Sequence, residues 1–187
     1  MKKTSYLLLL AGLTVSVRTA QATTVIPPTF DELVAQAEVI FQGDVTDVKS
    51  QWVGEGAQRH IVSYVTFKVE DALKGTPGQS YTIRMLGGTV DGETMGVSDA
   101  PKFKVGDKDI LFVQNNGSQF VPLVGIMHGR FHVKRDQAGQ EVVSNNEDEP
   151  VKNVARLGRV EAADGPEANL TAADFKAAVK SKLQAPK

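Results

Sequence analysis

The stretch HIVSYVTFKVEDAL, residues 60–73, decides the fold class of this chain. Polar and apolar side chains alternate along it, with Val65 and Phe67 on one side and Thr66 between them on the other. A period of two is typical of a β-strand that buries one face. The alternation slips near Ser63 and the run is long for one strand, so we predict a bent or bulged strand.

Further short segments rich in β-branched residues surround this strand. We predict strands at residues 39–48, 81–86, 89–90, 93–95, 110–114, 119–124, 128–135 and 140–144. Asp91-Gly92, Asn115–Ser118 and Asp136–Gly139 each lie between two of these strands, which predicts three β-hairpins. Pro122 has no N–H to donate to a neighbouring strand, so it marks a sheet edge or a bulge.

A helix is predicted near each end of the mature chain. In residues 29–37, Thr29 lies three residues before Glu32, which is the spacing of a capping box. Residues 170–185 carry an amphipathic pattern whose apolar face consists of Phe175, Val179 and Leu183. We expect this face to pack on the strands, and docking of a partner is the alternative.

Many short strands with a helix at each end predict a mainly β fold, an OB-like small β-barrel. We assign the barrel to residues 23–145. The segment 146–169 is acidic and contains prolines, so we expect a linker there. The C-terminal amphipathic helix at 170–185 follows it.

Residues 1–22 have the three parts of a secretory signal peptide. Lys2 and Lys3 precede a short apolar run, and Ala20-Gln21-Ala22 forms an Ala-x-Ala exit. We therefore expect cleavage after Ala22 and export to the periplasm or beyond the cell. The apolar run is too short and too interrupted for a membrane span, and no later stretch approaches the required length.

The composition of the chain excludes some classes of partner and of chemistry. The predicted signal peptide holds three basic residues and no acid, so the remaining 165 residues carry 18 basic and 22 acidic side chains. Nucleic-acid-binding proteins show a basic excess or stripe, and this chain has neither, so we predict no nucleic acid as partner. The chain contains no cysteine, which excludes disulfides, thiol catalysis and thiolate metal sites.

Three segments resemble the netrin-like domain, whose best-known members are the tissue inhibitors of metalloproteases. The first runs from Thr23–Pro28 through the predicted helix to Ala37–Val45. The second is Thr66–Gly75, and the third is Lys104–Phe112. The resemblance covers roughly residues 23–125 and implies a five-stranded OB-like barrel. It also implies an inhibitory N-terminus, although those inhibitors begin with a disulfide-bonded cysteine and this mature chain would begin with Thr23.

The stretch from Phe30 to Val133 is more similar still to uncharacterised exported bacterial proteins. In these, a Gly-Gly-Thr-Val segment and a Pro-x-Phe-x-x-Gly segment recur. The corresponding segments here are Gly87–Val90 and Pro101–Gly106. This resemblance implies no particular activity.

Few residues point to chemistry. His128 and His132 are four apart on a predicted strand, which separates them by about 13 Å, too far for one zinc ion unless the chain bends at Gly129. The run Glu147–Glu149 lacks the glycine and spacing of a calcium loop. Nucleophile elbows and phosphate loops are absent. We therefore predict no catalytic residue, no metal ligand and no cofactor.

The residues that remain as candidates for partner binding are Thr23, Thr24 and Trp52. Trp52 is the only tryptophan and follows the first long strand, in a predicted loop where OB-like barrels bind ligands. Packing against the loop is the alternative for this side chain. We predict an exported binding or interaction module for an unknown envelope protein or polymer. The alternatives are a netrin-like metalloprotease inhibitor acting through its processed N-terminus and an envelope hydrolase with a dispersed site.

Overall fold

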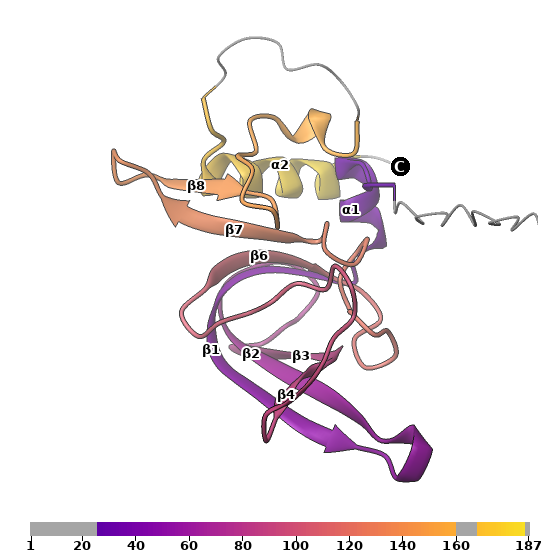
Figure 1. The fold of residues 1–187 in the computed structure, drawn as a ribbon. Coiled ribbons are helices and arrows are strands. Elements are labelled where there is room, and N and C mark those ends of the chain that lie inside the picture. The colour runs from indigo at the N-terminus through magenta and orange to yellow at the C-terminus, as the bar shows by residue number, and fades with distance from the viewer. Residues whose placement is uncertain (1–25, 160–167, 186–187) are drawn as a thin grey trace, which may run out of the picture.

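The computed structural model describes residues 26–159 and 168–185, so the predicted signal peptide and Thr23-Thr24 lie outside the described residues. The fold is mainly β, with a six-stranded antiparallel sheet, a separate two-stranded hairpin and a helix near each end (Figure 1). The sheet order is β3 (Ser80–Leu86), β2 (His60–Lys74), β1 (Val39–Val53), β6 (Lys108–Val113), β7 (Arg130–Arg135) and β8 (Glu141–Ser144).

The remaining elements are short. The separate hairpin consists of β4 (Gly88–Val90) and β5 (Glu93–Met95), joined by the predicted Asp91-Gly92 turn. The helices are α1 (Phe30–Gln36), α2 (Ala172–Gln184) and the 3₁₀ turns η1 (Gly56–Gln58) and η2 (Val154–Arg156). None of the helices in the described residues is long and apolar enough to cross a membrane.

Both α-helices cover the sheet where β6, β7 and β8 lie (Figure 1). The capping box predicted for α1 is present, because Thr29 Oγ1 accepts the Glu32 N–H and the Glu32 carboxylate accepts the Thr29 N–H. In α2, Phe175 is fully buried and its ring centroid lies 4.8 Å from that of Phe131 and 6.0 Å from that of Phe30. The predicted packing of this helix on the strands is therefore confirmed.

The other half of the sheet curls around a second core. Its strands β1 and β2 are bent by register shifts, one of them between Val45 and Asp47, because an extra residue on one strand locally increases its twist. The slip that the sequence suggests near Ser63 is absent, since Ser63 pairs regularly with Ser50 and Met85. Ser63 is a polar residue that faces inward, so it interrupts the alternation without any shift in strand pairing. The sequence pattern alone could not distinguish such a residue from a bulge.

The expected barrel is not closed. Within residues 26–159 and 168–185 the sheet ends at β3 and β8, and no strand joins the two. The Asn115–Ser118 turn forms, but residues 119–124 make a single bridge, Val113 to Leu123, in place of the predicted strand. Pro122 lacks the N–H that a regular ladder needs.

The segment after this turn instead covers the free edge of β3. The Asn116 side chain accepts the Arg84 N–H at 3.0 Å and donates to the Thr82 carbonyl at 2.8 Å. The Phe120 carbonyl accepts the Leu86 N–H at 2.7 Å. The edge is therefore hydrogen-bonded without a partner strand.

The free edge of β8 is covered in a similar way. Within the predicted linker, Val151 is buried and donates its N–H to the Val143 carbonyl. The Leu170 carbonyl accepts the Val143 N–H at 3.0 Å, and Val142 bridges Thr171 at the start of α2. Residues 146–159 of the predicted linker thus pack against the domain, residues 168–169 lead toward α2, and residues 160–167 lie outside the described part.

Candidate functional site

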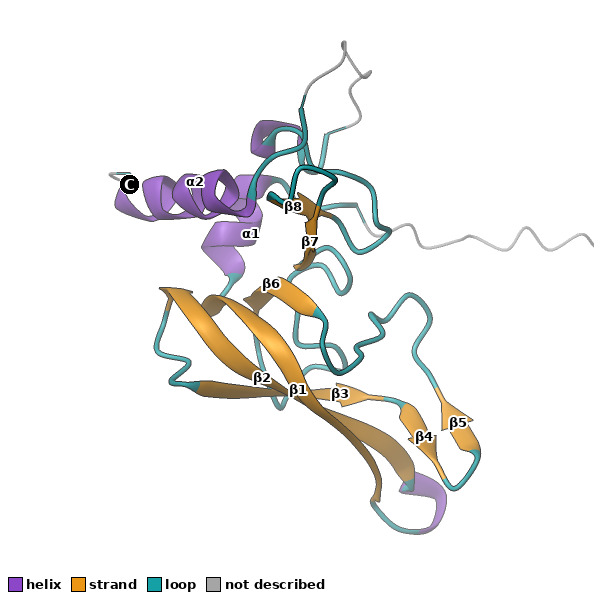
Figure 2. Cartoon of the chain, turned by 90° about the vertical axis from the view of Figure 1, so that its left-hand side faces the viewer, coloured by secondary structure: helices purple, strands orange, loops and turns teal. Residues whose placement is uncertain are grey.

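The chain folds back over the inner face of the sheet where β3 ends. Gly88 lies against the paired strands β1 and β2, and a Cβ atom there would come within 2.3 Å of both the Ser50 and Ser63 hydroxyl oxygens. The Ser63 hydroxyl donates to the Gly87 carbonyl at 2.6 Å, so the Ser50 hydroxyl donates to Ser63, at 2.8 Å. Only glycine fits at position 88, because any side chain would collide with these hydroxyl groups. After this close contact the chain continues into β4 and β5, which project beyond the end of β3 (Figure 2).

Between this hairpin and the sheet lies a cleft of about 870 Å³, which we call the hairpin cleft. Its volume is in the range of pockets that hold small ligands. Apolar side chains dominate its lining, among them Val48, Met85, Leu86, Met95, Val97 and Phe103. Hydroxyl groups come from Ser50, Ser63, Thr89, Thr94 and Ser98, and the only charged residues in the lining are Asp99 and Lys102.

The hairpin cleft brings together the two segments that the sequence analysis singled out, Gly87–Val90 and Pro101–Gly106. Gly87, Gly88 and Thr89 line it from the Gly87–Val90 segment. The other segment, Pro101–Gly106, contributes Pro101, Lys102 and Phe103. Sequence reasoning singled out both segments, but it did not predict that they form one site.

A buried cationic side chain holds the second segment in place. Arg130 on β7 is 2 % exposed and donates from Nη1 to the Lys102 carbonyl at 2.7 Å. Its guanidinium carbon lies 4.0 Å from the centre of the Phe103 ring, which is a cation–π contact. This wall of the cleft is therefore fixed to the sheet.

Two carboxylates accept hydrogen bonds from the Arg130 guanidinium. Asp107 Oδ2 accepts from Nη2 at 2.8 Å, and the fully buried Asp109 accepts from Nη2 at 2.9 Å and from Nε at 3.1 Å. Asp109 Oδ1 lies 2.8 Å from His132 Nδ1, which donates its hydrogen to the carboxylate. We call Asp107, Asp109, Arg130 and His132 the Arg130 cluster. Sequence reasoning missed all but His132, although Arg130, a charged residue inside the predicted strand 128–135, was a usable signal.

The hydrolase hypothesis concerns His128 and His132. His132 belongs to the Arg130 cluster, whereas His128 lines a different cleft. The other ring nitrogen of His132, Nε2, faces Asp148 Oδ1 at 3.7 Å. Ser144 lies opposite His132 on β8, but its hydroxyl makes no hydrogen bond to another described residue. No His, Asp and Glu side chains of the described residues gather into a group of three that could hold a metal ion. The hypothesis stays a prediction.

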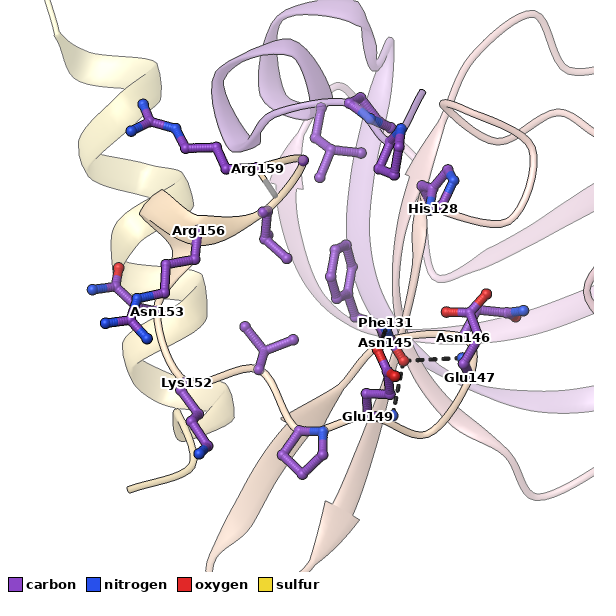
Figure 3. Close-up of a pocket in the computed structure, with 17 residues that line it drawn as sticks. His128, Phe131, Asn145, Asn146, Glu147, Glu149, Lys152, Asn153, Arg156 and Arg159 are labelled. Atoms are coloured by element: carbon purple, nitrogen blue, oxygen red, sulfur yellow. Dashed lines mark hydrogen bonds between the residues drawn. The ribbon is translucent and has the colours of Figure 1, made fainter. Parts of the chain in front are cut away.

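A second cleft, of about 520 Å³, contains His128 (Figure 3). Pro27 and Pro28 line it, so we call it the proline cleft. Other lining residues come from the loop at 145–150 and from the η2 region, which carries Arg156 and Arg159. The predicted acidic loop is a hydrogen-bonded turn, because Asn145 Oδ1 accepts the N–H groups of Glu147 and Glu149.

The start of the described chain is fastened at Pro28. A Cβ atom on Gly158 would come within 2.6 Å of the Pro28 carbonyl carbon, and one on Gly125 within 3.0 Å of the Pro28 ring. Both glycines have a positive φ, of 71° and 61°. Thr23 and Thr24 precede this anchor and lie outside the described residues, so their predicted partner binding and the inhibitor hypothesis stay predictions.

His128 makes the stability of the fold sensitive to acid. Burial lowers the pKa of its imidazole below the ordinary value of 6.5, against a smaller raising effect of nearby Glu147. As the pH falls, His128 therefore becomes protonated in the unfolded chain before it does so in the folded one. The contribution of this residue to stability is fully present above about pH 6.5 and is lost as the pH drops from there.

We expect His128→Asn to show a smaller loss of unfolding free energy than the wild type between pH 7.5 and 5.5, measured by urea denaturation. His60→Asn at the distal end of β2 is the control, and equal losses in both variants would contradict the assignment.

Trp52 lies in a strand and not in the predicted loop, because β1 runs on to Val53. It pairs with Ile61, and the Arg59 guanidinium carbon lies 4.0 Å from the centre of the indole ring. Strand alternation places Trp52 on the same face of β1 as Ser50, one step beyond the hairpin cleft. It does not line the cleft, and its role in partner binding stays a prediction.

No family model matches the chain, and a search of curated proteins finds no significant match.

Proposed function

We propose that this protein is an exported binding module whose hairpin cleft receives an uncharged part of an envelope protein or polymer. The observation that carries the proposal is the convergence of Gly87–Val90 and Pro101–Gly106 on one cleft of about 870 Å³. A site of this size with apolar walls and a few polar groups is the common form of a ligand pocket.

The lining supports an uncharged ligand. Asp99 and Lys102 offset each other, and the other lining side chains are apolar or carry hydroxyl groups. Lys102 is the only basic residue there, so the lining offers little to the phosphates of a nucleic acid. The Arg130 cluster supports recognition as well, because a wall that is already rigid loses little conformational freedom on binding.

The curled half of the sheet, β3-β2-β1-β6, has a shape consistent with an OB-like fold. We propose that it is a partly open form of that barrel, in which the loop 114–124 crosses the open side. OB-like barrels bind ligands on one face and through the adjoining loops. The hairpin cleft and Trp52 lie on the inner face of the same long strands.

Blocking the cleft tests the proposal. Ser98 is exposed and lines the cleft, so Ser98→Trp should fill it without disturbing the core. We expect the wild type to bind members of an array of envelope oligosaccharides and peptides at micromolar concentration, and the variant to bind them at least tenfold more weakly. Glu93→Trp is the matched control, since Glu93 is exposed on the same hairpin but outside the cleft. No binding, or equal binding by all three proteins, would refute the proposal.

A further inference from the structure

We propose that the ligand of the hairpin cleft is a peptide in extended conformation, whose main chain pairs with residues Gly96 and Val97. This inference rests on the proposed function and narrows it to one class of partner. The observations that carry it concern the unpaired main chain after β5, the edges of the large sheet and the chemistry of the lining.

Gly96 and Val97 follow the end of β5 and precede a turn of the chain. The turn is closed by the Ala100 N–H, which donates to the Val97 carbonyl at 3.2 Å. Within the described part of the chain, the N–H groups of Gly96 and Val97 and the Gly96 carbonyl have no hydrogen-bond partner. Gly96 also lines the cleft and has no side chain, so it presents its main chain to the cavity.

Other described segments cover both edges of the large sheet at least in part. The edge of β3 is occupied by Asn116 and the Phe120 carbonyl, and the edge of β8 by the segments around Val151 and Leu170. Among the described strands, the smaller sheet consists of β4 and β5, so each of them keeps one edge without a partner strand, and β5 is the one that leads into Gly96 at the cleft. An unpaired edge is a template for an added strand, which is a recurring mode of peptide recognition.

The side chains around this edge suit a peptide better than a charged ligand. In a bound strand, alternate side chains would point toward the sheet, where Met85, Met95 and Phe103 form an apolar surface. Methionine side chains adapt to partners of different shape. Thr94 and Ser98 offer hydroxyl groups near the free main chain, and these can accept or donate a hydrogen bond.

A random peptide library displayed on phage, selected on the purified protein, tests the inference. We expect enrichment of a peptide motif on the wild type and on Glu93→Trp but not on Ser98→Trp. The enriched peptide is then synthesised in its natural form and with alternate main-chain nitrogens methylated. Methylation removes the donors for strand pairing and leaves the side chains, so we expect affinity to fall about tenfold or more. Enrichment of no motif, or equal affinity of both forms, would overturn the inference.

Two variants at one position probe the protein side of this pairing. Gly96→Pro removes the N–H, whereas Gly96→Ala keeps it, and the position has open space for a Cβ atom. We expect the alanine variant to bind the selected peptide normally and the proline variant about tenfold more weakly, with circular dichroism confirming that both are folded. Equal peptide affinity in two folded variants would count against pairing at Gly96, and a misfolded proline variant leaves the methylated peptide as the deciding measurement.

The oligosaccharide array separates this inference from the proposed function. Binding of oligosaccharides alone, lost in Ser98→Trp, would refute the peptide and leave the binding module standing. Binding of neither class would refute both.

Discussion

Arg130→Met is expected to destabilise the fold by about 3–5 kcal/mol, because it leaves the carboxylate of Asp109 buried without its positive partner. Asp109 is 0 % exposed, and Arg130 supplies two of its hydrogen bonds. The same substitution releases the Lys102 carbonyl and the Phe103 ring, so the wall of the hairpin cleft should loosen as well. Urea denaturation measures the loss of stability, and limited trypsin digestion reports cleavage at Lys102.

Two further variants make this expectation specific. Arg135→Met removes a charge from the exposed end of the same strand, and we expect it to change stability by less than about 0.5 kcal/mol. The double variant Arg130→Met/Asp109→Leu removes both buried charges and should recover part of the stability. A loss below about 1 kcal/mol in Arg130→Met would show that the cluster does not hold the fold together.

Phe175→Ala is expected to cost about 3–5 kcal/mol, since it leaves a cavity between α2 and the sheet. The Phe175 ring is fully buried and packs against three other phenylalanine rings, those of Phe30, Phe112 and Phe131. The substitution should shift the midpoint of urea unfolding while leaving the slope unchanged, because the same surface is exposed on unfolding.

Leu183→Ala provides the control within the same helix. Leu183 was predicted to share the buried face, yet it is 38 % exposed in the last turn of α2. We expect this substitution to cost less than about 1 kcal/mol. Similar small losses in both variants would mean that the helix is only loosely attached and would reopen the alternative of a docking helix.

Local signals predicted most of the secondary structure. The capping residue Thr29 starts a helix, and Asp91-Gly92 and Asp136–Gly139 close hairpins. These features depend on residues close together in the sequence, where capping and turn chemistry decide the outcome. Residues 119–124 failed as a regular strand because Pro122 has no N–H to donate and the Phe120 carbonyl accepts from Leu86 on β3. The contact with β3 is distant in sequence and therefore invisible to a local pattern.

The site was less predictable than the fold. The resemblance singled out Gly87–Val90 and Pro101–Gly106, but only their distance in space shows that they share the hairpin cleft. Asp109 and Arg130 were overlooked because they are 21 positions apart in the sequence and nothing local to either residue indicates that the other lies beside it. The position of Trp52 was misjudged because β1 continues five residues past its predicted end.

The Arg130 cluster joins parts of the chain that lie far apart in the sequence, since it ties the loop at Lys102 and Phe103 to β6 and β7. In many small exported proteins a covalent cross-link between cysteines does this work. This chain has no cysteine, and the ion pairs and hydrogen bonds of the Arg130 cluster contain no bond that a thiol reductant or oxidant can break. The shape of the cleft wall is thereby independent of the redox state of the compartment in which the protein operates.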